Sequence, residues 1–424
     1  MGTKKNSIFG VTLLLFPLFI SISYAQITWE RNPNPVLNPG PSGSWDDSGV
    51  STSSVLFVGN EYKMWYMGKG GVGYASSPDG IVWTKSQANP VLLPGIASAW
   101  DGGRIAHVSV LFVNGTYQMW YNGVDGLNDN RIGYATSPDG IRWTKYAANP
   151  VVDLGSAGAW DDHEVMHPYV LLDGSTYRMY YNGFGNQLQR IGLATSTDGI
   201  KWTKHPANPL LAPGPLGAWD DDILGPLCVL PSQNLYLMWY FALSRNGIAR
   251  VGYATSTDWI HWTKYPSNPV LSAGAVGAWD DGGVAHPIVL FRDSVYKMWY
   301  SGLHGSFMRI GYASSRNVIS GVEESPGSQL QFTLGQNYPN PFNPSTTISY
   351  SLPKSSTVTL TIFNALGQGV ASLVNERKEA GRHQVTWDAA DVPSGVYFYH
   401  LQVRPVDNAP AWEVTQTKKL VLVR

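Results

Sequence analysis

The sequence predicts an all-β fold made from five copies of one unit, and three observations support this. A Trp-Asp pair recurs with steps of 55, 60, 59 and 60 residues, at Trp45, Trp100, Trp160, Trp219 and Trp279. Each copy then continues with an apolar run, M-W-Y or M-Y-Y, and G-Y-A or G-L-A. The chain is rich in glycine (45), tryptophan (17) and tyrosine (23), whereas only 14% of residues are charged. Such a profile is typical of short aromatic strands joined by glycine turns. A fixed period with a fixed internal order indicates a repeat architecture.

Each copy contains four strand signals. The inner strand follows W-D, the second holds M-W-Y, the third is the G-Y-A-T-S run, and the fourth carries W-T-K. An Asp-Gly pair between the last two predicts a tight hairpin, because glycine supplies the positive φ. These pairs stand at Asp79-Gly80, Asp139-Gly140 and Asp198-Gly199. The fourth copy has Asp258-Trp259 instead, so its turn must differ or be strained.

The two ends of the array indicate how it closes. The fifth copy has no W-T-K after Ser315, whereas Ile27-Thr28-Trp29-Glu30 precedes the first W-D. An N-terminal strand that completes the last sheet would leave no long unpaired edge. We therefore predict a five-bladed β-propeller over residues 26–315, closed by the N-terminal strand. A linear solenoid is the alternative, but it would need atypical capping repeats, and the sequence shows none.

Residues 1–25 have the pattern of a secretory signal peptide. Lys4 and Lys5 precede an apolar run from Ile8 to Ile22, and Ser23-Tyr24-Ala25 forms a small-x-small cleavage site. An uncleaved membrane anchor is the alternative, but the run is short for the ~20 residues of a span. We expect cleavage, and no membrane span after it.

The remainder of the chain reads as a linker and a separate domain. Residues 316–331 lose the aromatic pattern and contain Gly, Ser and Pro. Residues 332–424 carry alternating strand patterns that predict an Ig-like β-sandwich. The formal net charge of −1 argues against a nucleic-acid partner, and the single cysteine, Cys228, excludes an intramolecular disulfide.

The C-terminal domain resembles the sorting domain of the type IX secretion system. The motifs that carry this resemblance are N-Y-P-N-P-F-N-P at residues 337–344, F-N-A-L-G at 363–367 and S-G-V-Y-F-Y at 394–399. The resemblance implies the type IX machinery as a partner, and export through the periplasm and outer membrane to the surface or the medium. A generic Ig-like binding module is the alternative.

The repeat domain resembles the five-bladed propellers of glycoside hydrolase families 43, 32 and 130. The N-P-V-L connection, the D-G-x-Y-x-M-Y-Y strand pair and the A-T-S-x-D-G-I-x-W-T hairpin carry this resemblance. It implies an Asp from blade one, an Asp from blade two and a Glu from blade three, placed just before the inner apolar runs. This chain departs from that pattern, with Ser51-Thr52-Ser53, His107-Val108, His167-Pro168, Gly225-Pro226 and His286-Pro287 at the corresponding sites.

Differences between the copies point to candidate site residues. Glu164 is the only acid at its repeat position and lies in the third copy, where the resembled family keeps its acid. We expect Glu164 to be the proton donor if the protein is an enzyme, with Asp47 or Asp162 as the base. Residues expected to contact substrate are Arg104, His107, His163, His167 and His286.

Three of these histidines, His107, His167 and His286, would converge on the channel from three blades. They could bind a metal, contact sugar hydroxyls or orient a phosphate. We expect sugar contacts, with no metal and no cofactor. The first Asp of each W-D recurs in every copy, which favours a structural bond to backbone N–H groups.

Taken together, these features predict a secreted, glycoside hydrolase-like protein that acts on a glycan in a central funnel. A non-catalytic propeller that binds glycan or protein at the cell surface is the alternative. Whether the protein is an enzyme stays open at this point.

Overall fold

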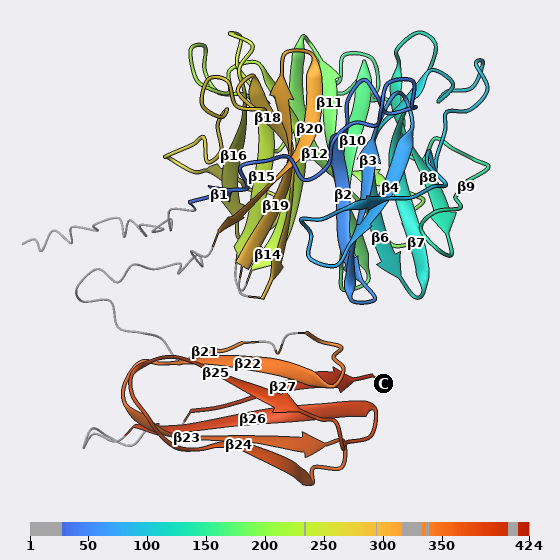
Figure 1. Cartoon of the computed structure of the whole chain (residues 1–424). Helices are drawn as coiled ribbons and strands as arrows, with labels where there is room; N and C mark the ends of the chain where they lie inside the picture. The colour runs from blue at the N-terminus through green and yellow to red at the C-terminus, as the bar shows by residue number, and fades with distance from the viewer. Residues whose placement is uncertain are drawn as a thin grey trace, which may run out of the picture. The chain divides into compact units, whose positions relative to one another are not determined.

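The computed structural model describes residues 28–232, 235–293, 295–315, 333–335, 337, 339–405 and 414–423. The chain divides into two compact units, Met1–Val322 and Glu323–Arg424. The described residues form β-strands and no helix, which confirms the all-β prediction (Figure 1). Among them there is consequently no helix with the length and hydropathy of a membrane span. The expected signal peptide (1–25) and linker (316–331) lie outside the described residues.

In the first unit, each of the first four repeats forms four antiparallel strands in chain order. The first repeat contains β2 (Ser51–Val58), β3 (Glu61–Met67), β4 (Val72–Ser77) and β5 (Thr84–Lys85). The second contains β6 (Arg104–Val113), β7 (Thr116–Val124), β8 (Asn130–Ser137) and β9 (Thr144–Lys145). The third contains β10 (Glu164–Asp173), β11 (Thr176–Gly185), β12 (Leu188–Ser196) and β13 (Thr203–Lys204). The fourth contains β14 (Ile223–Ser232), β15 (Leu235–Leu243), β16 (Ala249–Ser256) and β17 (Thr263–Lys264).

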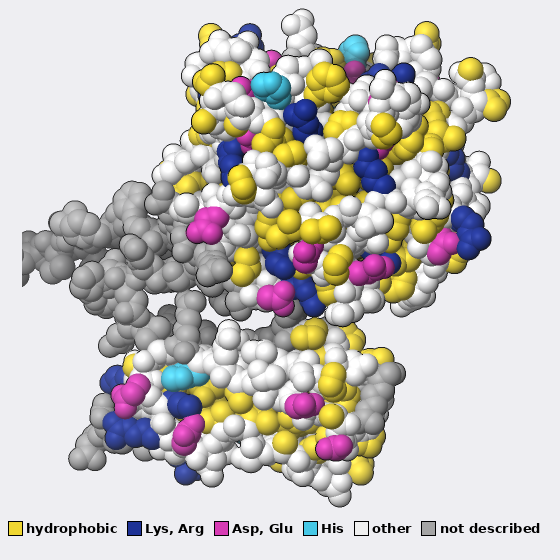
Figure 2. Space-filling view, viewed as in Figure 1, with side chains coloured by type: hydrophobic (Ala, Val, Ile, Leu, Met, Phe, Trp, Pro, Cys, Tyr) yellow, Lys and Arg dark blue, Asp and Glu magenta, His cyan; other side chains and the backbone are white. Residues whose placement is uncertain are grey.

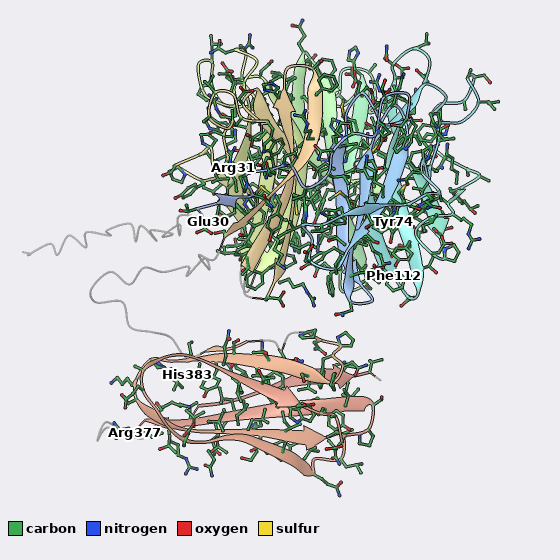
Figure 3. All side chains as sticks on the ribbon, viewed as in Figure 1. Glu30, Arg31, Tyr74, Phe112, Arg377 and His383 are labelled. Atoms are coloured by element: carbon green, nitrogen blue, oxygen red, sulfur yellow. The ribbon has the colours of Figure 1, made fainter. Side chains whose placement is uncertain are left out.

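The fifth repeat contains β18 (Gly283–Arg292), β19 (Val295–His304) and β20 (Phe307–Ser315), and the N-terminal β1 (Glu30–Arg31) joins it. Glu30 pairs with Ser314 and Arg31 with Ala313. The W-T-K strands pair with their third strands in the same register. Figure 3 labels both β1 residues on their strand. Trp29-Glu30-Arg31 therefore stands where the other repeats have W-T-K.

The hydrogen-bonded sheets of the first unit do not close into one continuous sheet. Strands β1, β20 to β18, β16 to β14 and β12 to β10 form one path, joined by single parallel bridges between repeats. The first two repeats form separate sheets. The innermost strands nevertheless lie next to one another in the order β2, β6, β10, β14, β18, and β18 also contacts β2.

Tryptophans from the second strands tie neighbouring repeats together. Trp65 donates its indole N–H to the glycine carbonyl of the Asp-Gly turn in the next repeat, Gly140, at 2.8 Å, and Trp120 donates in the same way to Gly199 at 2.7 Å. In the same way, Trp299 of the fifth repeat donates to Gly80 of the first at 2.7 Å. A Cβ added at Gly80 would lie 2.7 Å from the Trp299 ring, so this turn needs glycine for space as well as for its φ of 81°.

In the fourth repeat the corresponding contact between the turn and the neighbouring repeat is made by different residues, as the unusual turn sequence suggested. Trp259 occupies the glycine position with a φ of 72°, a left-handed conformation that costs energy for a bulky residue. Its ring stacks on Tyr236 with centroids 3.6 Å apart. The facing residue of the third repeat is Tyr180, not tryptophan, and its hydroxyl donates to the Trp259 carbonyl at 2.8 Å. The smaller phenol thus compensates for the larger turn residue.

The first aspartate of each W-D pair is buried and structural, but its partners differ from our prediction. Asp101 Oδ2 accepts hydrogen bonds from the Lys145 ammonium at 2.6 Å and from the Tyr121 hydroxyl at 3.2 Å, not from backbone N–H groups. The lysine is the last residue of W-T-K, so this ion pair joins the innermost edge of a repeat to its outermost strand. In the fifth repeat Arg31 replaces the lysine and binds Asp280 at 2.7 Å.

The second unit forms two packed sheets. One contains β21 (Thr333–Leu334), β22 (Ser345–Leu352) and β25 (Gly381–Asp388). The other contains β24 (Gly369–Lys378), β23 (Ser356–Asn364), β26 (Gly395–Pro405) and β27 (Val414–Leu422). Side chains of both sheets, including Ile348 and Leu360, share one core. On the face seen in Figure 2, acidic and basic side chains are interspersed over both units.

Candidate functional site

Three histidines meet in the first unit, as the sequence predicts; His107 is buried, and His167 and His286 are half-buried. His107, His167 and His286 come from β6, β10 and β18. The ring centroid of His107 lies 5.5 Å from that of His167 and 5.8 Å from that of His286. Phe241 of β15 lies beside them, its ring centroid 6.0 Å from that of His286. Four of the five repeats therefore contribute a side chain to this cluster, which we call the histidine cluster.

Backbone irregularities aim these side chains. The innermost strands carry a β-bulge at this level, between Met166 and Tyr169 in β10 and between Ala285 and Ile288 in β18. His167 and His286 occupy these bulges, both with a φ of 51°. A proline follows each of them, and its missing N–H needs no ladder partner. Bulges re-aim a side chain out of the regular alternation, which here brings imidazoles together.

Several nitrogens of the histidine cluster lack a hydrogen-bond partner among the described residues. These unpartnered atoms are both ring nitrogens of His107, which is 4% exposed, and Nδ1 of His167. Nδ1 of His286 lies 3.0 Å from Ser301 Oγ. Buried polar atoms are nearly always satisfied, so unpartnered nitrogens at one place indicate a site for a polar ligand or for water.

Burial keeps the histidine cluster uncharged. Burial lowers the pKa of His167 to about 3, with the neighbouring His286 acting in the same direction. Burial alone lowers the pKa of His286 to about 4. The pKa of His107 is pushed well below its usual value by burial and then by the other two imidazoles. Each ring at neutral pH thus offers one N–H donor and one acceptor nitrogen.

Glu164, the first residue of β10, is half-buried. Its Oε2 accepts a hydrogen bond from the Asn130 amide at 3.0 Å. Burial raises the pKa of Glu164, while the positive charge of Arg104 opposes this shift and Asp129 adds to it. A carboxyl group with a raised pKa retains its proton more readily at neutral pH, as a general acid requires.

The positive charge of Arg104 acts to lower the pKa of Glu164 and that of His167 in the histidine cluster. Arg104 is exposed at the start of β6. His163 is largely exposed, with Nε2 3.7 Å from Asp162 Oδ1, and its ring lies 6.2 Å from that of Phe184.

The two aspartates expected as bases have structural bonds. Asp47 Oδ2 accepts the backbone N–H of Gly43 at 2.8 Å, and Asp162 Oδ2 accepts that of Gly158 at 2.7 Å. Asp221 and Asp281 make the same bond in the fourth and fifth repeats. Asp162 differs in one respect, because its Oδ1 is buried and has no hydrogen-bond partner among the described residues.

Sequence reasoning missed two asparagines of this region. Asn130 and Asn122 are 7% and 0% exposed, and they form a hydrogen-bonded pair beside Glu164. The sequence offered a signal only for Asn130, which differs from its counterparts in the other repeats, whereas Asn122 recurs as Asn182 in the third repeat. Within the described residues no group of three His, Cys, Asp or Glu side chains is arranged to hold a metal ion.

The second unit matches a known family. Residues 336–407 match the family described as the secretion system C-terminal sorting domain. The chain therefore carries a type IX sorting domain and is exported by that system to the cell surface or beyond.

Solved structures resemble the first unit in fold. A thermostable family-43 glycoside hydrolase is 20% identical and covers 63% of this chain and 88% of its own, with a TM-score of 0.52. A member of the GH130 family of mannoside phosphorylases is 18% identical, covers 74% and 99%, and has a TM-score of 0.56. A glycosyl hydrolase from Bacteroides ovatus is 18% identical, covers 69% and 94%, and has a TM-score of 0.54. At such low identity the likeness shows that the propeller fold is shared, and it says nothing about activity.

Two sequence relatives come from Mycobacterium tuberculosis. Uncharacterized protein Rv1502 of strain ATCC 25618 / H37Rv is 30% identical over 234 residues, which are 52% of this chain and 74% of the relative. Uncharacterized protein MT1551 of strain CDC 1551 / Oshkosh is 29% identical over the same length, with the same coverage. The chain thus belongs to the same protein family as the uncharacterized protein Rv1502 of Mycobacterium tuberculosis.

Proposed function

We propose that the first unit is a five-bladed propeller whose ring the N-terminal strand completes. Three contacts between the fifth and first repeats support this. Trp299 donates to Gly80, the backbone N–H of Thr52 donates to Ser301 Oγ at 3.0 Å, and β18 contacts β2. Each of them repeats or replaces a contact between earlier neighbours.

Within this ring, the protein is a secreted, glycoside hydrolase-like protein that takes a glycan into its central funnel. The observation that carries this proposal is the set of unpartnered nitrogens in the histidine cluster. A sugar hydroxyl both donates and accepts, and a neutral imidazole does the same, so the two match without any charge being buried. Arg104 and His163 contact substrate nearer the solvent. The glycoside hydrolase neighbours and the export signal agree with a glycan as the ligand.

Glu164 is the proton donor in the catalytic form of this proposal. It gives its proton to the departing oxygen as the glycosidic C–O bond breaks, and water adds its hydroxyl to the sugar carbon. The proton that water loses passes to a base, and exchange with solvent then restores both groups. Asp162 is the better candidate for that base, because its buried Oδ1 accepts no hydrogen bond from any described residue. Asp47 is the weaker candidate, because it makes the same turn bond as Asp162 without such a buried, unpartnered oxygen.

A non-catalytic glycan-binding propeller is the second candidate. The observation that favours it is the shared turn bond of Asp47, Asp162, Asp221 and Asp281. A residue that does the same structural task in four repeats is not specialised for one reaction. In this form the histidine cluster and Arg104 hold the sugar, and Glu164 contributes a hydrogen bond only.

The two candidates differ in one experiment. The secreted protein is incubated with arabinan, fructan and mannoside substrates, and both binding and release of reducing ends are measured. The catalytic form predicts that Glu164→Gln loses about 100-fold or more in rate but keeps binding. Glu30→Gln, an exposed glutamate of β1, is the matched control. Binding without any product from the wild type would support the second candidate, and neither binding nor product would refute both.

A further inference from the structure

Asn130 lies between Glu164 and the interior of the second repeat. Its amide nitrogen donates to Glu164 Oε2 at 3.0 Å and to the Asn128 carbonyl at 3.0 Å. Its amide oxygen accepts from the Asn122 amide nitrogen, also at 3.0 Å. Asn130 is 7% exposed, so water contributes little to its hydrogen bonding.

Asn122 fixes which way round the Asn130 amide sits. The Asn122 nitrogen also donates to the Gly123 carbonyl at 3.2 Å, so it is committed as a donor and presents nitrogen, not oxygen, to Asn130. Asn130 must therefore accept with its oxygen, and its nitrogen must point to the Asn128 carbonyl and to Glu164. If the Asn130 amide were flipped, its NH2 group would face the NH2 group of Asn122, two donors. Its oxygen would then face the Asn128 carbonyl and the Glu164 carboxylate, which are both acceptors.

We propose that the Asn122–Asn130 pair is a positioning relay that forces Glu164 Oε2 to be an acceptor and so places the acidic proton on Oε1. A protonated carboxyl has one O–H, and an oxygen that accepts the Asn130 N–H at close range is the poorer place for it. Burial favours the protonated form of Glu164, whereas Asn130 and Arg104 favour the ionised form. The relay thus selects the oxygen and also limits how tightly the proton is held.

The pattern is specific to this corner of the ring. Met179-Tyr180-Tyr181-Asn182 of the third repeat matches Met119-Trp120-Tyr121-Asn122 in sequence, but Asn182 donates instead to the backbone carbonyl of Leu224. The same residue at the same repeat position therefore reaches a carboxyl-bound partner only next to Glu164. This relay rests on the proposed role of Glu164 as the proton donor, but its effect on the carboxyl group is measurable without any substrate.

The test is a ¹³C NMR titration of the intact protein labelled at glutamate Cδ, with the Glu164→Gln protein used to assign the Glu164 signal. Asn130→Ala should raise the measured pKa of Glu164 by about one unit, the size of one hydrogen bond to a charged group at 1.36 kcal/mol per unit. Asn122→Ala should give a smaller rise, because Asn130 then remains but is free to flip.

Asn268→Ala is the control for loss of a half-buried asparagine. Asn268 bonds the Tyr253 backbone in the fourth repeat and has no contact with Glu164, so the variant should lose stability and leave the Glu164 pKa unchanged. An unchanged pKa in Asn130→Ala would overturn the relay. A raised pKa in a protein without glycan-cleaving activity would support the relay while refuting the catalytic role of Glu164.

Discussion

Acid should weaken the first unit through its histidine cluster. In the folded chain burial lowers the pKa of His286 to about 4 and that of His167 to about 3, whereas an unfolded histidine titrates near its ordinary value of 6.5. Between these values the unfolded state binds more protons, so the free energy of unfolding falls as the pH falls below 6.5. The loss is about 1.4 kcal/mol per pH unit for each histidine, or about 2.5 kcal/mol each from pH 6.5 to pH 4.5.

Urea unfolding at pH 7.0 and at pH 4.5, followed by near-ultraviolet circular dichroism, measures this loss. His286→Gln removes one titrating group, so its stability should fall by about 2.5 kcal/mol less than that of the wild type over the same interval. His261→Gln, whose side chain is 86% exposed, is the control. An equal acid loss in His286→Gln and the wild type would refute the claim that this histidine is uncharged in the folded protein.

Three further predictions follow from the same contacts. Arg104→Met removes a positive charge that lowers the Glu164 pKa, so the high-pH limit of activity should move to higher pH in a rate profile. Arg31→Met breaks the ion pair of the fifth repeat and should lower the unfolding free energy by about 2 kcal/mol in urea, whereas Arg31→Lys, which copies the other repeats, should recover most of it. Tyr180→Trp should make the larger ring clash with Trp259, which lowers the melting temperature and costs about 1–3 kcal/mol of unfolding free energy. Adding Trp259→Gly should restore the melting temperature. Unchanged stability in Arg31→Met, or a double variant that is worse than Tyr180→Trp alone, would contradict these accounts.

The order of the repeats was predictable because the motifs that define them recur along the sequence. The W-D, M-W-Y and G-Y-A motifs recur at a near-constant spacing; W-D precedes the innermost strand, and M-W-Y and G-Y-A lie in the second and third strands. Trp29 matched the tryptophan of the missing W-T-K, and β1, which follows it, pairs with β20 in that register. The strained turn at Trp259 was also predictable, since only the glycine of that motif is replaced.

Contacts between repeats were harder to infer. The partner of Asp101 is Lys145, which follows it by 44 residues, and nothing local in the sequence joins them. The bond from Asn130 to Glu164 depends on how the third strand of one repeat lies against the first strand of the next. Strand β24 is hard to predict because most of its side chains are exposed, which removes the apolar alternation that marks a half-buried strand.

The most direct test of the histidine-lined funnel is a crystal structure of the Glu164→Gln protein with an oligosaccharide that it binds. The account predicts sugar hydroxyls about 3 Å from the now unpartnered nitrogens of His107 and His167. It also predicts the glycosidic oxygen facing the position of Glu164 Oε1. A sugar bound elsewhere on the propeller, with these nitrogens still unpartnered or bound only to water, would contradict it.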